Sequence, residues 1–308
     1  MRILMFGRGV IATLYGRVLA GAGHDVEFYV RPGRAAQYGD EVQLDWIDGR
    51  RKPLGRRMRE SYRTVLRESI DPGDGFDLIV LSVGHHRLAE AAEFLAPRLG
   101  AATVLVFGNV FDEPLAAAAP LPADRLVFGF PGAGGGFLDD GLLWGAMLPS
   151  IVVGTTGEAP TSREQQVFDA FRQAQVAVRQ EADMRGWLWL HFVADAGMFD
   201  QAIRSGSLAN MSGDRRAFRD AFLTARELLP VLEARGIDLG RHRAATVPFR
   251  MPRLIGTVSG WATSLIPIAR RSLAAHTDPH ASEALAVIGD TLTEARRLGI
   301  PTPRLDRP

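Results

Sequence analysis

The sequence predicts an α/β protein in which a doubly wound, mostly parallel sheet precedes an all-helical domain. Up to residue 182, short apolar runs alternate with helix-like segments, as in proteins built on a parallel sheet. Residues 183–308 hold only long helix-like segments separated by Gly, Pro or Ser clusters. The chain also has 308 residues, more than one hydrophobic core usually serves. We therefore expect two domains, 1–182 and 183–308.

The elements of the first domain follow from the apolar pattern, taken in chain order. Continuous apolar runs indicate strands buried on both faces, and apolar residues with a period near 3.6 indicate helices. The predicted strands are residues 3–6, 26–30, 78–81, 103–107, 126–130, 142–147, 151–153 and 176–178, and the predicted helices are 10–22, 88–99 and 162–174. This order of strand and helix favours a parallel sheet with crossover helices.

Two segments need separate interpretation. Val42, Leu44 and Trp46 alternate with polar residues before Asp48-Gly49 and a basic run, which predicts a solvated hairpin. In the second domain the predicted helices span 184–203, 214–235, 252–274 and 279–298. The apolar stretch 255–268 suits the core better than the alternative, a helix that forms a homodimer.

Composition excludes several classes of function. The 36 Lys and Arg residues balance 35 Asp and Glu residues, so no overall field attracts nucleic acid or an anionic membrane. The chain has no cysteine, which excludes disulfides, thiolate nucleophiles and cysteine-based metal sites. Lys52 is the only lysine. No uninterrupted apolar run approaches the ~18 residues of a membrane-spanning helix. We therefore expect a cytoplasmic protein without a membrane partner, and from the charge balance we expect no nucleic-acid partner.

A glycine-rich turn follows the first predicted strand. The segment Gly7-Arg8-Gly9-Val10-Ile11-Ala12 has the pattern G-x-G-x-x-A and opens the first helix. The glycines allow a tight turn and close approach of a pyrophosphate to the helix N-terminus, and the alanine lets helix and strand pack closely. The sequence therefore predicts a dinucleotide site.

The end of the second strand indicates which dinucleotide binds. An NAD enzyme usually has an acidic residue there, whereas this chain has Arg31 and Arg34. Two guanidinium groups suit a 2′-phosphate, so NADP is favoured. The alternative is that both arginines are ordinary exposed charges.

These features together resemble the ketopantoate reductase family. They are the glycine turn, an arginine after the second strand, Asn109 after a buried strand, and the helical second half. The resemblance implies a Rossmann domain, a C-terminal domain like that of 6-phosphogluconate dehydrogenase, and NADPH-dependent reduction of 2-dehydropantoate to pantoate in an interdomain cleft.

The resemblance also implies roles for individual residues. Asn109 would contact the nicotinamide ribose and the substrate; the alternative is that it caps the next helix, and the two roles could coexist. Ser82 follows a strand beside the cofactor, and Gly134 lies in a glycine-rich loop, residues 129–136, that either flanks the nicotinamide or is a flexible linker. Glu283 would help to hold the substrate, or be an ordinary first-turn glutamate.

The proton donor departs from the family pattern. Typical relatives use a lysine on the first helix of the second domain, and Lys52 cannot fill that place. His191 and Asp195 are four residues apart on that helix and share a face. A carboxylate favours the imidazolium form, so we hypothesise that His191 donates the proton and Asp195 orients it near the substrate. The alternative is that His191 is a packed residue among aromatic neighbours.

The sequence thus favours an NADPH-dependent reductase of a small 2-oxo acid. A reductase of another carbonyl or imine, as in opine chemistry, and a non-catalytic NADP-binding sensor are the alternatives. We predict no metal site, because the adjacent His85 and His86 have no evident acidic partner. The substrate carboxylate could bind Arg204, Arg241 or Arg250, and the sequence does not choose among them.

Overall fold

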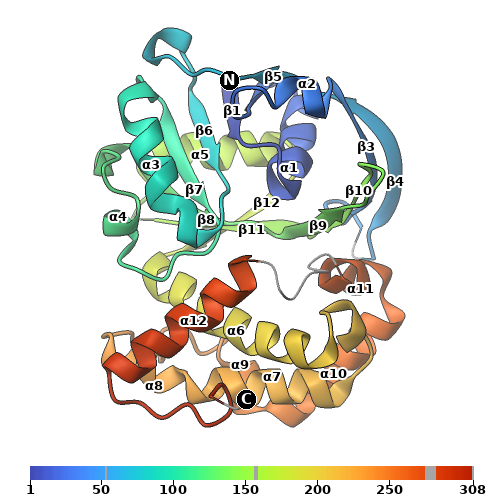
Figure 1. Ribbon diagram of the computed structural model, residues 1–308, viewed down its shortest axis with the longest axis vertical. Coiled ribbons are helices and arrows are strands. Elements are labelled where there is room, and N and C mark those ends of the chain that lie inside the picture. Colours follow the sequence, from blue (N-terminus) through green and yellow to red (C-terminus); the bar gives the residue numbers. More distant parts are fainter. Residues whose placement is uncertain (53, 156–158, 275–281, 307–308) are drawn as a thin grey trace. The chain divides into compact units, whose positions relative to one another are not determined.

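The computed structural model describes residues 1–52, 54–155, 159–274 and 282–306. The chain divides into two compact units, Met1–Met184 and Arg185–Pro308. The first unit contains the strands and the second is helical, as Figure 1 shows. The fold class predicted from the sequence is confirmed.

The main sheet of the first unit has eight strands. Its order is β12-β11-β8-β7-β6-β1-β2-β5, and every neighbouring pair is parallel except β8 with β11. The central strands β6 and β7 are buried along their whole length and are almost entirely apolar, because both of their faces are covered. The bounds are β1 Arg2–Phe6, β2 Asp25–Tyr29, β5 Val65–Arg67, β6 Leu78–Leu81, β7 Thr103–Phe107, β8 Leu126–Phe130, β11 Ser150–Gly154 and β12 Ala177–Glu181.

A second sheet of four strands was not predicted. It has the order β4-β3-β10-β9 and curves beside helix α1 in Figure 1. Its strands are β3 Glu41–Asp48, β4 Arg56–Arg63, β9 Ala133–Phe137 and β10 Leu143–Met147. The expected hairpin is present as β3 and β4, but its description as solvated was wrong for β3, where Val42, Leu44 and Trp46 are buried.

The interpretation of residues 129–136 as a loop was also wrong. Gly129 and Phe130 belong to β8, and Gly134 lies in β9, which pairs with β10. The glycines allow close contact: a Cβ on Gly135 would lie 2.7 Å from the Trp144 carbonyl oxygen and 2.8 Å from Val10 Cγ1. This run of glycines therefore brings β9 against helix α1.

Helices of the first unit connect the strands. Helix α3 ends at Leu95 rather than Leu99 because Pro97 lacks the amide that would continue the hydrogen bonds, and a 3₁₀ turn follows. The helices are α1 Val10–Gly21, α2 Ala35–Tyr38, α3 Leu88–Leu95, α4 Pro114–Ala117 and α5 Ser162–Gln173. One core cluster joins α1 and α5 with side chains from both sheets.

Prolines also divide the predicted helices of the second unit. The expected helix 214–235 is two helices because of Pro230, and 252–274 breaks at Pro267. The helices are α6 Met184–Ser205, α7 Arg215–Glu227, α8 Leu229–Ala234, α9 Val247–Arg250, α10 Pro252–Leu265, α11 Pro267–Ala274 and α12 Ser282–Arg297. The first residues of the expected helix 279–298 lie outside the described residues. Across the described part of the chain, no helix is both long enough and apolar enough to cross a bilayer.

The expectation that residues 255–268 belong to the core was wrong for one face of α10. Gly256 and Gly260 are buried against α7. Val258, Trp261 and Leu265 are 54%, 59% and 69% exposed. We call these three side chains the apolar face of α10.

Candidate functional site

The glycine turn joins β1 to α1 and leaves open space before it. Gly7 has φ +96°, a conformation that favours glycine, and its N–H donates to the Tyr29 carbonyl over 2.9 Å. A Cβ built on Gly7 or Gly9 would meet no atom within 4 Å. Gly9 caps α1 without a side chain, and the first turn of α1 has no acidic residue. The amides of this turn, including those of Val10 and Ile11, therefore suit an external anion.

This turn lies where the order of the sheet reverses. Strand β1 pairs with β2 on one side and with β6 on the other, and β7 pairs with β6. The carboxyl ends of these parallel strands meet at one edge, which is where ligands bind in such sheets. Ser82 directly follows β6, and Asn109 follows β7 after one glycine. Both predicted residues therefore lie at the same edge of the sheet as Gly7.

The side chains of Ser82 and Asn109 are largely shielded from solvent at this edge. The Ser82 hydroxyl is buried and has no hydrogen-bond partner among the described residues. Asn109 is 8% exposed. The alternative role of Asn109 as a helix cap is wrong, because α4 begins later and its N-cap residue is Glu113.

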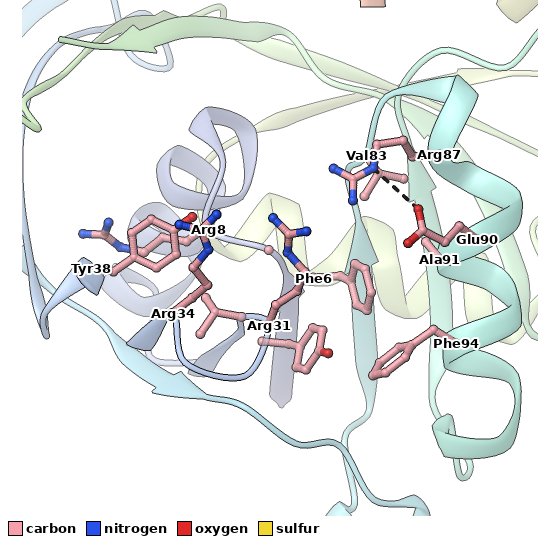
Figure 2. Close-up of a pocket in the computed structure, with 13 residues that line it drawn as sticks. Phe6, Arg8, Arg31, Arg34, Tyr38, Val83, Arg87, Glu90, Ala91 and Phe94 are labelled. Atoms are coloured by element: carbon pink, nitrogen blue, oxygen red, sulfur yellow. Dashed lines mark ion pairs between the residues drawn. The ribbon is translucent and has the colours of Figure 1, made fainter. Parts of the chain in front are cut away.

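A cavity of about 400 Å³ opens at this edge (Figure 2). One side is aromatic: the Tyr29 ring stacks on Phe94 with centroids 5.1 Å apart, and Phe6 lies 5.1 Å from Tyr29. The other lining residues are Gly7, Arg8, Val30, Arg31, Arg34, Tyr38, Val83, Arg87, Glu90 and Ala91. The cavity thus combines an apolar wall with four guanidinium groups and a single carboxylate.

The predicted arginines enter the cavity from separate elements. Arg8 belongs to the glycine turn, lies over the Tyr38 ring at 5.0 Å and donates to the Glu41 carbonyl over 3.2 Å. Burial lowers the pKa of Arg8, which still leaves it charged near neutral pH. Arg31 is exposed after β2, and Arg34 donates to the Gln37 side chain over 2.6 Å. These arginines could be predicted from the sequence. Arg8 lies within the glycine pattern, and Arg31 and Arg34 follow the end of a predicted strand.

Residues 31–35, here called the arginine loop, are held by a glutamate that the sequence did not indicate. Glu68 follows β5, the strand beside β2, and accepts the Ala35 N–H over 2.8 Å. Further backbone hydrogen bonds from Gly33 and Arg34 lower the pKa of Glu68 together with the first. One carboxylate thus fixes three successive amides of the loop that carries the arginines. Nothing in the sequence distinguishes Glu68 from an ordinary exposed glutamate.

Gly134 is not among the residues that line the cavity. Its neighbourhood is nevertheless tied to α1, because the Gly132 N–H donates to the Tyr15 hydroxyl over 2.9 Å. Burial raises the pKa of Tyr15, so this hydroxyl stays protonated. The strand that contains Gly134 thus lies against the helix that begins at the glycine turn.

The second unit holds the remaining predicted residues. His191 and Asp195 lie one turn apart on α6, with Nε2 and Oδ1 3.5 Å apart. The His191 ring stacks on Trp187 at an angle of 11°, with centroids 5.1 Å apart. Glu283 is half-buried in the first turn of α12. The structure therefore pairs His191 with Asp195 as the spacing predicted, beside an aromatic ring.

The candidates for the substrate carboxylate differ in their surroundings. Arg204 already pairs with Asp200 at 3.0 Å. Arg241 lies 3.9 Å from Asp238 at the surface. Arg250 lines a different cavity, within the second unit.

We predict that Glu68→Gln lowers the Tm at pH 7 and that this difference vanishes in acid. The pKa of Glu68 is lowered in the folded protein, so its carboxylate stabilises the fold above its ordinary value of 4.5. That stabilisation is lost as the pH falls through the lower folded value. Thermal unfolding of both proteins between pH 7 and pH 3 measures it. Glu93→Gln, an exposed change on α3, is the control, and a Tm difference that stays constant in acid would contradict the prediction.

Residues 3–157 match the sequence profile of the family described as ketopantoate reductase PanE/ApbA. No curated protein matches the chain.

Solved structures show the same fold over nearly the whole chain. A 2-dehydropantoate 2-reductase from Porphyromonas gingivalis W83 has 13% identity and a TM-score of 0.65, with 100% of this chain and 97% of that chain covered. The enzyme of the same name from Geobacter metallireducens GS-15 has 18% identity and a TM-score of 0.66, with coverages of 99% and 97%. A D-mandelate dehydrogenase in complex with NADH and anilino(oxo)acetate has 13% identity and a TM-score of 0.69, with coverages of 99% and 95%. Because the family profile matches half of the chain, the protein belongs to the ketopantoate reductase PanE/ApbA family of oxidoreductases.

Proposed function

We propose that this protein binds NADPH at the carboxyl edge of its main sheet and reduces a small 2-oxo acid. The observation that carries the proposal is the cavity beside the glycine turn, where Arg8, Arg31 and Arg34 surround open space. The solved relatives include enzymes named for 2-dehydropantoate and for D-mandelate, and the second holds NADH. A nicotinamide nucleotide and a 2-oxo acid are therefore the reactants that the family favours.

The residues present fit the adenosine half of such a nucleotide. The amides of the glycine turn would bind the pyrophosphate, since no protein side chain fills the space in front of them. The stacked rings of Tyr29 and Phe94 offer an apolar surface for a base. Arg31 and Arg34 supply positive charge for a 2′-phosphate, and no acidic residue stands in their loop. The donor set therefore favours NADPH over NADH.

We predict that Arg31→Gln weakens NADPH binding about 10- to 100-fold and leaves NADH binding nearly unchanged. A hydrogen bond to a charged group contributes about 1.5–3 kcal/mol, and only NADPH carries the 2′-phosphate. Fluorescence titration with both nucleotides measures the two Kd values. Arg63→Gln, which removes an exposed arginine paired with Asp40, is the matched control. An equal loss for both nucleotides would contradict the assignment of Arg31 to the 2′-phosphate.

The chemical step needs a proton donor beside the nucleotide. Bound NADPH supplies a hydride to the carbonyl carbon, and a protein group must protonate the carbonyl oxygen. We propose His191 for this role and Asp195 as the positioning residue, given their 3.5 Å separation. The only lysine, Lys52, lies in the β3–β4 hairpin of the first unit. Asn109 and Glu283 are proposed to contact the substrate, with Asn109, Ser82 and Gly134 near the nicotinamide.

We predict that His191→Gln lowers kcat for ketopantoate about 10²- to 10⁴-fold, the usual contribution of a general acid. The Kd for NADPH should stay unchanged, because the proposed nucleotide contacts lie in the first unit. Steady-state NADPH oxidation and nucleotide titration measure the two quantities. His86→Gln, at an exposed histidine, is the control. Undiminished turnover would remove His191 from the mechanism, and tight NADPH binding by the wild type without any turnover would favour a non-catalytic binding protein.

We also propose that the apolar face of α10 binds a second copy of the chain. Residues 254–269 contain no charged residue, in a protein where nearly a quarter of all residues are charged. An uncharged face paired with itself about a two-fold axis buries apolar area and no charge. Its members Val258, Trp261 and Leu265 have the three- and four-residue spacing of a helix–helix seam. A homodimer is the partner that this spacing and neutrality favour.

We predict that Trp261→Arg raises the dimer dissociation constant at least ~30-fold, the effect of losing an interface hot spot. Sedimentation velocity over a range of protein concentrations measures it. Leu115→Arg adds the same charge at another exposed apolar position, on α4 of the first unit, and is the control. A wild-type protein that stays monomeric at every concentration would contradict the proposal.

A further inference from the structure

A second cavity lies wholly within the helical unit and has about 630 Å³ of space. Three separate segments line it: α7, the junction of α9 and α10, and Arg304 near the C-terminus. No residue of this cavity belongs to the cavity beside the glycine turn. It is therefore a separate candidate site.

The charge of its lining is strongly one-sided. Five arginines face a single carboxylate, Asp220, and Arg219 already binds that carboxylate over 2.8 Å. Arg304 pairs with Glu227 at 3.1 Å. The whole chain balances 36 basic residues with 35 acidic ones, so composition alone does not explain five arginines against one acid. The folding of three distant segments brings these charges together.

Three of the five arginines have no acidic partner among the described residues. Arg226 lies in the last turn of α7, Arg250 ends α9, and Arg253 lies in the first turn of α10. All three side chains are exposed around one concavity, so an anion bound between them would be attracted by more than one guanidinium group. Arginine also binds phosphate and carboxylate oxygens in bidentate fashion.

The N-terminus of α10 adds to the positive electrostatic potential in this cavity. The helix begins at Pro252, its first turn has no acidic residue, and its N-cap Met251 provides no side-chain hydrogen bond. The positive end of the helix dipole therefore faces this cavity without compensation. Leu223, Met251 and Leu254 give the cavity an apolar wall beside its charges. An anion with an apolar portion matches both kinds of surface.

We propose that this cavity binds a small organic polyanion, one with two or more phosphate or carboxylate groups on an apolar body. A single substrate carboxylate needs one or two guanidinium groups, whereas this cavity offers three that are unpaired and two more beside them. Arg250, considered above for the substrate carboxylate, belongs to this polyanion site. The site would allow a phosphorylated metabolite to bind the helical unit independently of the nucleotide.

The test uses inorganic pyrophosphate as the probe, in calorimetric titrations of the full chain at low salt with NADPH in excess, so that the glycine turn is already occupied. The triple variant R226Q/R250Q/R253Q should bind pyrophosphate at least ~30-fold more weakly than the wild type. The variant R216Q/R241Q/R243Q removes three exposed arginines of the same unit from outside the cavity and should bind like the wild type. Arg31→Gln should also bind like the wild type, which separates this site from the first cavity.

Several results would overturn the proposal. They are no binding to the wild type, equal binding by the wild type and the first triple variant, or a loss in Arg31→Gln as large as in that variant. Thermal unfolding must show that the triple variant is folded, and its Kd for NADPH should equal that of the wild type. The same proteins are also titrated with phosphatidylglycerol vesicles and, separately, with a single-stranded oligonucleotide. Binding of either one without pyrophosphate binding would replace the small-molecule site by a surface for a macromolecular polyanion.

Discussion

The burial of helix α1 between two sheets is the constraint on which the rest of the first unit depends. Leu14, Tyr15 and Leu19 are fully buried in a core that joins the main sheet to β3 and β10. A helix held on both sides cannot shift along its axis without opening that core. Its N-terminus, and with it the glycine turn, therefore has a fixed position relative to the ends of β1, β2 and β6.

That fixed position explains why so few side chains are needed at the edge of the sheet. The turn supplies backbone amides, and the neighbouring strand ends supply Ser82, Asn109 and the arginine loop. Positive charge is gathered where the amides already favour an anion, because Arg8, Arg31 and Arg34 all border the same cavity. The packing of the core and the electrostatics of the edge thus depend on the same helix.

Local patterns in the sequence were enough to predict the main sheet and the glycine turn. Apolar runs such as 78–81 are continuous because both faces are covered, and the pattern around Gly7 and Gly9 serves a local geometry. The four-stranded sheet was missed because it joins segments 99 residues apart, as in the pairing of Leu143 in β10 with Leu44 in β3, and one of its strands is mostly glycine. Glu68 was missed for the same reason: its role depends on strand β5 pairing beside β2, and no local signal records that pairing.

Glu68 holds the arginine loop through its backbone, so the shape of the loop does not depend on the charged side chains that it carries. The carboxylate binds main-chain amides of Gly33, Arg34 and Ala35, groups that every residue except proline possesses. The side chains of Arg31 and Arg34 can therefore be replaced without loss of these hydrogen bonds, whereas Gly33, with φ +78°, has a conformation that favours glycine. The positive charge that borders this cavity can thus be altered by single substitutions while the architecture of the pocket persists.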